Sequence, residues 1–210
     1  ISNNLGNAYM LNGKMDLALK FYTLSLEQDK KTNSDISSGI ATSYNNIGNL
    51  YRVCGEYDQA IHYLTQSLEI SRIVFGKDSL EYASSCNSLA TTFLEIGEYA
   101  KAIDYFESAK DVYYRFYGED HTDTALILNN LGYAMSENGE NEKGLPLVEK
   151  SLEIRLRLLG NIHPDVAASM HNIGIIYRRL GYFDKAILYL QESLDIKTKL
   201  FGENHPDVSG

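Results

Sequence analysis

Asparagines that recur at a fixed spacing are the side chains in this sequence best suited to bind another molecule. One series follows steps of 42 residues and comprises Asn4, Asn46, Asn130 and Asn172, with Ser88 at the third position. A second series lies one residue earlier and includes Asn45, Asn87 and Asn129. An amide offers both a donor and an acceptor, so it can hold the main chain of an extended peptide without reading its side chains.

Asparagine is costly inside a helix because its side chain competes with the backbone for hydrogen bonds. Two interpretations of its repetition stay open. The amides face a bound peptide, or they form hydrogen bonds between neighbouring repeats and fix their register, and both can hold for different members. The predicted peptide-binding residues are Asn4, Asn7, Asn45, Asn46, Asn49, Arg52, Asn87, Asn129, Asn130, Tyr133, Asn172 and Arg178.

The same 42-residue step governs the small residues. The recurring glycines are Gly13, Gly55, Gly97, Gly139 and Gly181. A fixed period of this length is typical of helical repeat arrays. The predicted units span residues 1–34, which is truncated, then 35–76, 77–118, 119–160 and 161–202, with 203–210 as the start of a further unit or a tail. We expect residues 1–210 to form a single solenoid that is part of a longer protein.

Each unit is predicted to contain two helices. Ile40, Tyr44, Ile47 and Tyr51 are separated by steps of three and four residues, which makes an apolar stripe at the helical period. Gly55 is placed to end this helix with a left-handed cap, and Gly76 ends the helix that follows. Each unit is therefore expected to be a helical hairpin.

The crossing of the two helices is predicted from small residues. Gly48 and Ala60 are expected where the helices approach closely, since a large side chain there would separate them. The fourth unit departs from this pattern. It has Asn141 at an aromatic position, Gly144 in place of alanine, and Pro146 early in its second helix. Because proline removes a backbone donor and can kink a helix, we expect the fourth hairpin to be the least regular.

The pattern Ile47-Gly48-x2-Tyr51, followed by Ala60 and Leu64, resembles the tetratricopeptide repeat. The usual unit has about 34 residues, and the longer unit with Asn-Asn-Leu-Gly and a Gly-x2-His-Pro-Asp loop resembles the kinesin light chain subclass. This resemblance implies an all-α, right-handed superhelical solenoid of antiparallel helix-turn-helix hairpins whose first helices line a concave groove. It also implies that the asparagines before Leu-Gly face the ligand, namely Asn4, Asn46, Asn130 and Asn172.

Charge narrows the class of partner. The formal net charge is −9, which disfavours nucleic acid and anionic membrane surfaces because such binding needs clustered Lys and Arg. Within the groove, Arg52, Arg178 and Arg179 predict basic spots in the second and fifth units. Glu95 and Glu137 predict an acidic middle. The partner is therefore expected to be a protein or peptide.

No enzyme chemistry is predicted. Cys54 and Cys86 form no CxxC pair, and two thiols make neither a disulfide framework nor a zinc site. Three of the five histidines occupy one repeated loop position, which predicts helix-start residues: His121, His163 and His205. No phosphate-binding or dinucleotide-binding motif is present, so no metal, cofactor or catalytic residue is expected. No apolar run is long enough for a membrane helix, and we expect a cytoplasmic protein.

Three functional hypotheses remain. The first is an adaptor that holds an extended partner segment in the groove. The second is a regulatory array that controls a caspase-like or nucleotide-binding effector domain elsewhere in a larger protein. The third is a scaffold that self-associates through its truncated ends. The complete polypeptide sequence would separate the second hypothesis from the first.

Overall fold

The structure, a computed structural model, describes residues 2–32 and 36–203, and these residues form ten helices and no strand. The all-α, helical-repeat architecture predicted from the 42-residue period is therefore confirmed. Two earlier expectations lie outside the described residues. They are the boundary between the first two units, at residues 34 and 35, and most of the tail that begins with Glu203 and includes His205.

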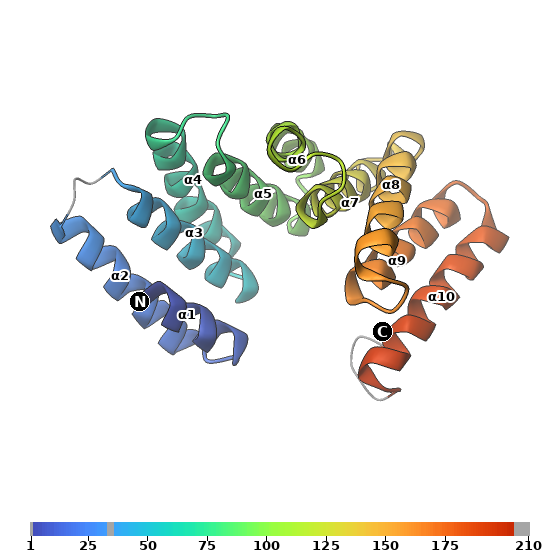
Figure 1. Cartoon of the computed structure of the whole chain (residues 1–210), viewed down its shortest axis with the longest axis horizontal. Helices are drawn as coiled ribbons and strands as arrows, with labels where there is room; N and C mark the ends of the chain where they lie inside the picture. Colours follow the sequence, from blue (N-terminus) through green and yellow to red (C-terminus); the bar gives the residue numbers. More distant parts are fainter. Residues whose placement is uncertain (1, 33–35, 204–210) are drawn as a thin grey trace. The chain divides into compact units, whose positions relative to one another are not determined.

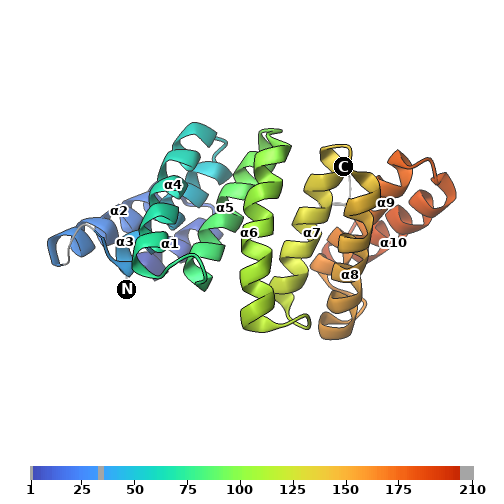
Figure 2. The ribbon, with the colours of Figure 1, turned by 90° about the horizontal axis from the view of Figure 1, so that it is seen from above.

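The chain forms two compact units, Ile1–Glu98 and Tyr99–Gly210. The helices of the first unit are α1 (Ser2–Leu11), α2 (Met15–Thr32), α3 (Ser38–Val53), α4 (Tyr57–Val74) and α5 (Leu80–Glu95) (Figure 1). The helices of the second unit are α6 (Tyr99–Tyr117), α7 (Thr122–Glu137), α8 (Asn141–Leu159), α9 (Pro164–Arg179) and α10 (Phe183–Phe201) (Figure 1). Within each unit, helices that follow one another in the chain pack side by side (Figure 2).

Helix ends follow the repeated glycines and polar caps. Gly55 ends α3 and Gly76 ends α4, with φ of 77° and 85° in the left-handed region that favours glycine. The histidine loops are helix caps, as predicted. His121 and His163 precede α7 and α9, and the Nδ1 atom of each accepts a hydrogen bond of 3.1 Å from the backbone N–H two residues later. These bonds satisfy donors that the first turn of a helix leaves unpaired.

The two helices of a hairpin are joined by apolar side chains at repeated positions. Stacked aromatic pairs recur, with ring centroids 5.3 to 5.7 Å apart, at Tyr9–Phe21, Tyr51–Tyr63 and Tyr177–Tyr189. The leucine or isoleucine before the repeated glycine, or before Ala90 in the third repeat, is at most 2% exposed in four helices, at Ile47, Leu89, Leu131 and Ile173. The exception is Leu5 on α1, which is 42% exposed.

The fourth hairpin is regular, so the expectation that it would be the least regular is wrong. Helix α8 runs without interruption through Pro146 over 19 residues. Proline this early in a helix removes one backbone donor, and the rest of the helix is held by its packing on α7. A Cβ on Gly132 would lie 2.6 Å from the carbonyl oxygen of Gly144. The glycine in place of alanine therefore brings α7 and α8 closer together.

The predicted crossing at Gly48 is confirmed. A Cβ there would lie 2.6 Å from Leu64 Cγ and 3.1 Å from Leu64 N on α4. Such distances are far shorter than ordinary carbon contacts of about 3.5–4.0 Å. Gly48 is required because no larger side chain fits between α3 and α4.

Candidate functional site

The first helices of the hairpins lie next to one another within each unit. Helix α3 contacts α1 and α5 in the first unit, and α7 contacts α9 in the second. We call the surface formed by α1, α3 and α5, and the surface formed by α7 and α9, the first-helix faces. All twelve predicted binding residues lie on these five helices, because each belongs to the first helix of its repeat.

In the first unit, α3 is tied to α5 by two side-chain contacts. Asn49 Nδ2 donates to Ser88 Oγ at 3.1 Å and to the carbonyl oxygen of Asn45 at 3.0 Å. One turn further on, the guanidinium of Arg52 forms an ion pair with Glu95. Asn49 and Arg52 therefore link neighbouring repeats, which is the structural role that the sequence left open.

Two further amides on this face have unused hydrogen-bonding capacity. The Oδ1 atoms of Asn45 and Asn87 are buried and have no partner among the described residues. Leaving such an acceptor unpaired costs roughly 1–3 kcal/mol. Asn45 and Asn87 occupy the same position in consecutive repeats, so the unpaired acceptor is a repeated feature of the face.

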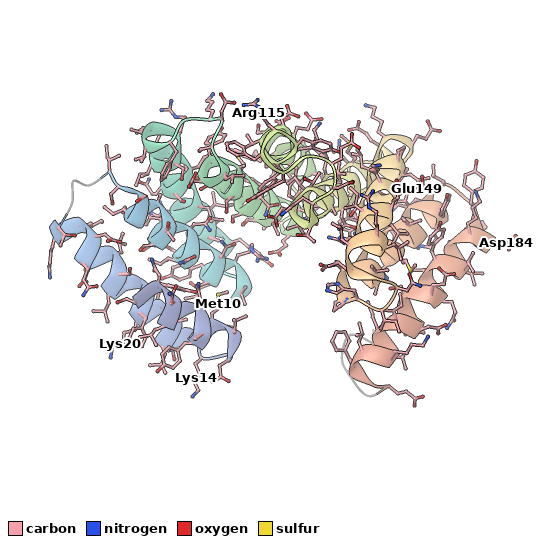
Figure 3. The ribbon with its side chains drawn as sticks, viewed as in Figure 1. Met10, Lys14, Lys20, Arg115, Glu149 and Asp184 are labelled. Atoms are coloured by element: carbon pink, nitrogen blue, oxygen red, sulfur yellow. The ribbon has the colours of Figure 1, made fainter. Side chains whose placement is uncertain are left out.

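The remaining amides of the first unit lie on α1 and α3. Asn7 Oδ1 accepts a hydrogen bond of 2.7 Å from the Tyr22 hydroxyl, which also lies 3.8 Å from the sulfur of Met10, labelled in Figure 3. Asn4 is exposed and Asn46 is partly buried. Within the described part of the chain, neither of these two side chains forms a hydrogen bond. Both side chains therefore keep their full hydrogen-bonding capacity for a partner.

In the second unit, Asn129 connects α7 to α9. This residue is 6% exposed, and its Oδ1 atom accepts hydrogen bonds of 3.2 Å from Ser169 Oγ and from Asn172 Nδ2. Its Nδ2 atom donates to Asn130 Oδ1 at 3.2 Å. Three predicted binding residues thus form one hydrogen-bonded group, in which Asn129 is internal and the other two are partly buried.

A second arginine–glutamate ion pair links the C-terminal ends of α7 and α9. Arg179 donates to Glu137 at 2.7 Å and to Ser136 Oγ at 3.0 Å. Burial and a hydrogen bond with Glu137 raise the pKa of Tyr133 to about 12, so its phenol is neutral near pH 7. Arg178 is exposed and makes no ion pair with the described residues.

The predicted charge pattern of the groove needs correction. Arg52 and Arg179 were expected to be separate basic spots, with Glu95 and Glu137 as an acidic middle. Instead, each arginine is paired with a glutamate of the neighbouring repeat, 43 or 42 residues away. The pairing arises because equivalent positions on adjacent first helices lie within side-chain reach. Both faces are therefore more neutral than predicted, and Arg178 remains as an exposed charge.

The Arg179–Glu137 pair is expected to stabilise the protein only modestly. Its side chains are 29% and 16% exposed, and partly exposed pairs typically contribute about 0.2–1 kcal/mol. A double-mutant cycle with Glu137→Gln and Arg179→Met, read from urea unfolding, should give a coupling free energy of about 0.5 kcal/mol. A coupling above about 2 kcal/mol would contradict the assignment of this pair as a screened surface contact.

The sequence reasoning missed a set of buried serines. Each bridges the two helices of its hairpin by donating to a backbone carbonyl 26 residues earlier, at distances of 2.6 to 2.8 Å: Ser67, Ser151 and Ser193. A sequence pattern could have identified these serines, because Ser-Leu-Glu/Asp-Ile recurs at residues 67–70, 151–154 and 193–196. These serines join the helices by polar contacts within an otherwise apolar interface.

Arg155 was also missed, and no repeat signal could have revealed it. It is 3% exposed on α8, and its Nη1 atom donates to the carbonyl oxygen of Asp165 at 2.7 Å and to Ser169 Oγ at 2.9 Å. Burial lowers the pKa of its guanidinium, which stays charged near neutral pH. The equivalent residues in the other four repeats are Asp29, Ser71, Tyr113 and Lys197.

The described residues contain no group of three or more His, Cys, Asp or Glu side chains that could hold a metal ion. Burial raises the pKa of the Cys86 thiol to about 11, so this cysteine is protonated near neutral pH. Glu149, labelled in Figure 3, accepts a hydrogen bond of 2.9 Å from the Tyr177 hydroxyl and serves as a packing contact. None of the helices in residues 2–32 and 36–203 has the length and apolar composition needed to cross a membrane.

The glycine-ended hairpins and the contacts between first helices define an α-helical repeat protein. The Tetratricopeptide repeat family profile matches residues 39–115, 97–143 and 123–199, and a second profile of the same description matches residues 2–35. Since these matches cover most of the sequence, the chain belongs to the tetratricopeptide repeat family. This confirms the resemblance first indicated by Ile47-Gly48-x2-Tyr51.

Solved structures share the fold. BtubC (BKLC) from P. vanneervenii has a TM-score of 0.80 and 24% identity over 96% of this chain and 80% of its own. The TPR-like repeats of a candidate kinesin light chain from Podosopora anserina have a TM-score of 0.77 and 20% identity over 95% of each chain. YrrB, described as a TPR protein with an unusual peptide-binding site, has a TM-score of 0.58 and 20% identity over 93% of this chain and 84% of its own. No curated protein sequence shows significant similarity to the chain.

Proposed function

We propose that this chain is a non-catalytic protein-interaction module whose first-helix faces hold an extended segment of a partner protein. The observation that carries the proposal is the repeated, incompletely used amide. Asn4 and Asn46 have no hydrogen-bond partner in the described residues, and buried oxygens of Asn45 and Asn87 are unpaired. Amides with free hydrogen-bonding capacity suit a ligand whose own peptide groups need partners.

The charges on the faces support a ligand recognised mainly through its main chain. Arg52 and Arg179 are each paired with a glutamate of the same unit, so these pairs leave little net charge to attract an acidic or basic motif. The proposal is also in keeping with the described peptide-binding site of YrrB, which shares the fold. In this chain the ligand would be an uncharged, extended peptide segment.

The experiment uses a display library of random-sequence peptides selected on the full chain. A selected peptide is then titrated against the Asn46→Ala/Asn130→Ala double variant by calorimetry. Each hydrogen bond contributes about 1 kcal/mol, so loss of two amides should weaken binding by roughly 30-fold. The matched control is Asn12→Ala/Asn161→Ala, which alters two exposed amides in turns and should bind like the wild type.

Two outcomes would overturn the proposal. One is a selected peptide that binds the folded Asn46→Ala/Asn130→Ala variant with unchanged affinity, since the amides would then have no part in recognition. The other is the absence of any selected peptide whose binding depends on the first-helix faces. Circular dichroism of each variant establishes that its helices are intact.

A further inference from the structure

Arg155 is a buried cation that fixes the direction of the hydrogen bonds it forms with its two neutral partners. It donates to Ser169 Oγ at 2.9 Å and to the carbonyl oxygen of Asp165 at 2.7 Å. A guanidinium has five donors and no acceptor. Any hydrogen bond between these two side chains therefore runs from Arg155 to Ser169, and the serine hydrogen is left to donate elsewhere.

The Ser169 hydroxyl, which accepts a hydrogen bond from Arg155, donates its own hydrogen to Asn129. Its Oγ atom lies 3.2 Å from Asn129 Oδ1 and 3.4 Å from Ser151 Oγ, while Ser151 donates its own hydrogen to the carbonyl oxygen of Ala125 at 2.6 Å. The shorter contact directs the Ser169 hydrogen to Asn129 Oδ1. Donation from the cation strengthens this bond, because consecutive hydrogen bonds polarise one another.

The orientation of Asn129 determines that of the two amides beside it. Asn172 Nδ2 donates to Asn129 Oδ1, and Asn129 Nδ2 donates to Asn130 Oδ1. The atoms of these two amides that form no hydrogen bond with the described residues are an acceptor, Asn172 Oδ1, and a donor, Asn130 Nδ2. Neither is among the buried unpaired atoms of the described residues. The face thus presents one acceptor on α9 and one donor on α7.

The second hairpin lacks the arginine and serves as an internal comparison. The counterparts of Arg155, Ser169 and Asn129, found 84 residues earlier, are Ser71, Ser85 and Asn45. Ser85 Oγ lies 3.0 Å from Ser67 Oγ, 3.1 Å from the carbonyl oxygen of Glu81 and 3.4 Å from Ser71 Oγ, and Asn45 Oδ1 is left without a partner among the described residues. Without a cation to direct the serine, the amide is not engaged.

The first hairpin gives the opposite direction. Its counterparts, a further 42 residues earlier, are Asp29, Ser43 and Asn3. The shorter of the two contacts between Asn3 and Ser43 has Asn3 Nδ2 donating to the serine at 3.2 Å. The amide therefore accepts in the fourth hairpin, where Arg155 contacts the serine, is unpaired in the second, and donates in the first. In the third hairpin the serine is replaced by Ile127, and Asn87 Oδ1 is unpaired.

We infer that Arg155 is a positioning residue that orients the Asn130 and Asn172 amides so that together they bind the C=O and N–H of one residue of an extended partner segment. In an extended chain, these two groups of a single residue point to the same side. The inference rests on the proposed function and makes it more specific. The partner residue at this point is not proline, because proline lacks the N–H.

The positioning role is tested by NMR on the chain of residues 1–210 without peptide. We expect the side-chain amide hydrogens of Asn129 and Asn172 to exchange with solvent about 10-fold faster in Arg155→Met than in the wild type, since one hydrogen bond is weakened. Ser71→Ala, at the matched position of the second hairpin, should leave these rates unchanged. Arg155→Ser, which installs the residue found in that hairpin, replaces Arg155→Met if the latter does not fold. Unchanged exchange in a folded Arg155 variant overturns the inference.

The recognition role is tested with a peptide selected from the random library, N-methylated at each position in turn. One N-methylation should weaken binding to the wild type at least 10-fold, and the same modification should weaken binding to Arg155→Met less than about 3-fold, because a single hydrogen bond is at stake. Equal losses in both proteins overturn the inference and leave the proposed function standing. If the library yields no binder, the proposed function fails together with the recognition role, while the exchange rates still decide the positioning role.

Discussion

Gly144→Ala is expected to lower the free energy of unfolding by about 2 kcal/mol, although alanine is the residue that all four other repeats carry at this position. A Cβ at Gly144 would overlap the carbonyl oxygen of Gly132, and it would lie 3.3 Å from the backbone N of Ser136. Backbone cannot move aside as a side chain can, so the overpacking should cost about 3 kcal/mol. Alanine is the better helix former by roughly 1 kcal/mol, which offsets part of that cost.

The measurement is urea unfolding followed by circular dichroism. Gly39→Ala is the matched control, because it also adds a methyl group to a glycine inside a helix. Its Cβ would lie 2.6 Å from Oδ2 of Asp29, and a carboxylate at the end of a side chain can rotate away. This control should therefore stay within about 1 kcal/mol of the wild type. A Gly144→Ala protein as stable as the wild type would show that α7 and α8 do not cross at van der Waals contact.

Leu131→Ala is expected to destabilise the protein by about 3 kcal/mol, whereas Leu5→Ala should cost less than about 1 kcal/mol. The two leucines occupy the same position in their repeats, but Leu131 is 1% exposed and Leu5 is 42% exposed. Truncating the buried side chain removes its apolar transfer free energy and leaves a cavity. Truncating the half-exposed one removes only part of the transfer free energy.

Both variants are compared in one series of urea transitions on the full chain. Because neighbouring repeats can unfold separately, hydrogen exchange of α7 and of α1 should accompany the transitions and assign each loss to its own hairpin. Equal destabilisation by the two substitutions would mean that repeat position, rather than burial in the structure, determines what this leucine contributes.

Most of the architecture could be predicted because it depends on short-range patterns. The apolar stripe through Ile47 and the glycine at residue 55 each report a local requirement, burial on one helix face and a positive φ. The error concerned the fourth hairpin. Local rules made Pro146 a disruption, but packing against α7 through Gly144 keeps α8 continuous.

The candidate site was predictable only in part. The first helices were identified, but the partner of each polar side chain depends on what the next repeat supplies. Asn49 meets Ser88, while Asn129 meets Asn172. No other repeat has an arginine at the position of Arg155. The 42-residue period identifies only residues that recur, so it could not identify Arg155.

The contacts between first helices have a consequence for how this sequence can change in length. Asn49, Arg52, Asn129 and Arg179 each bind a residue 39 to 43 positions away. One residue inserted into a helix between two such partners would rotate everything beyond it by about 100°. Every such contact across the insertion would be lost at once. Within the helices, deletions and insertions should therefore be tolerated only in multiples that restore the helical phase, or as whole repeats.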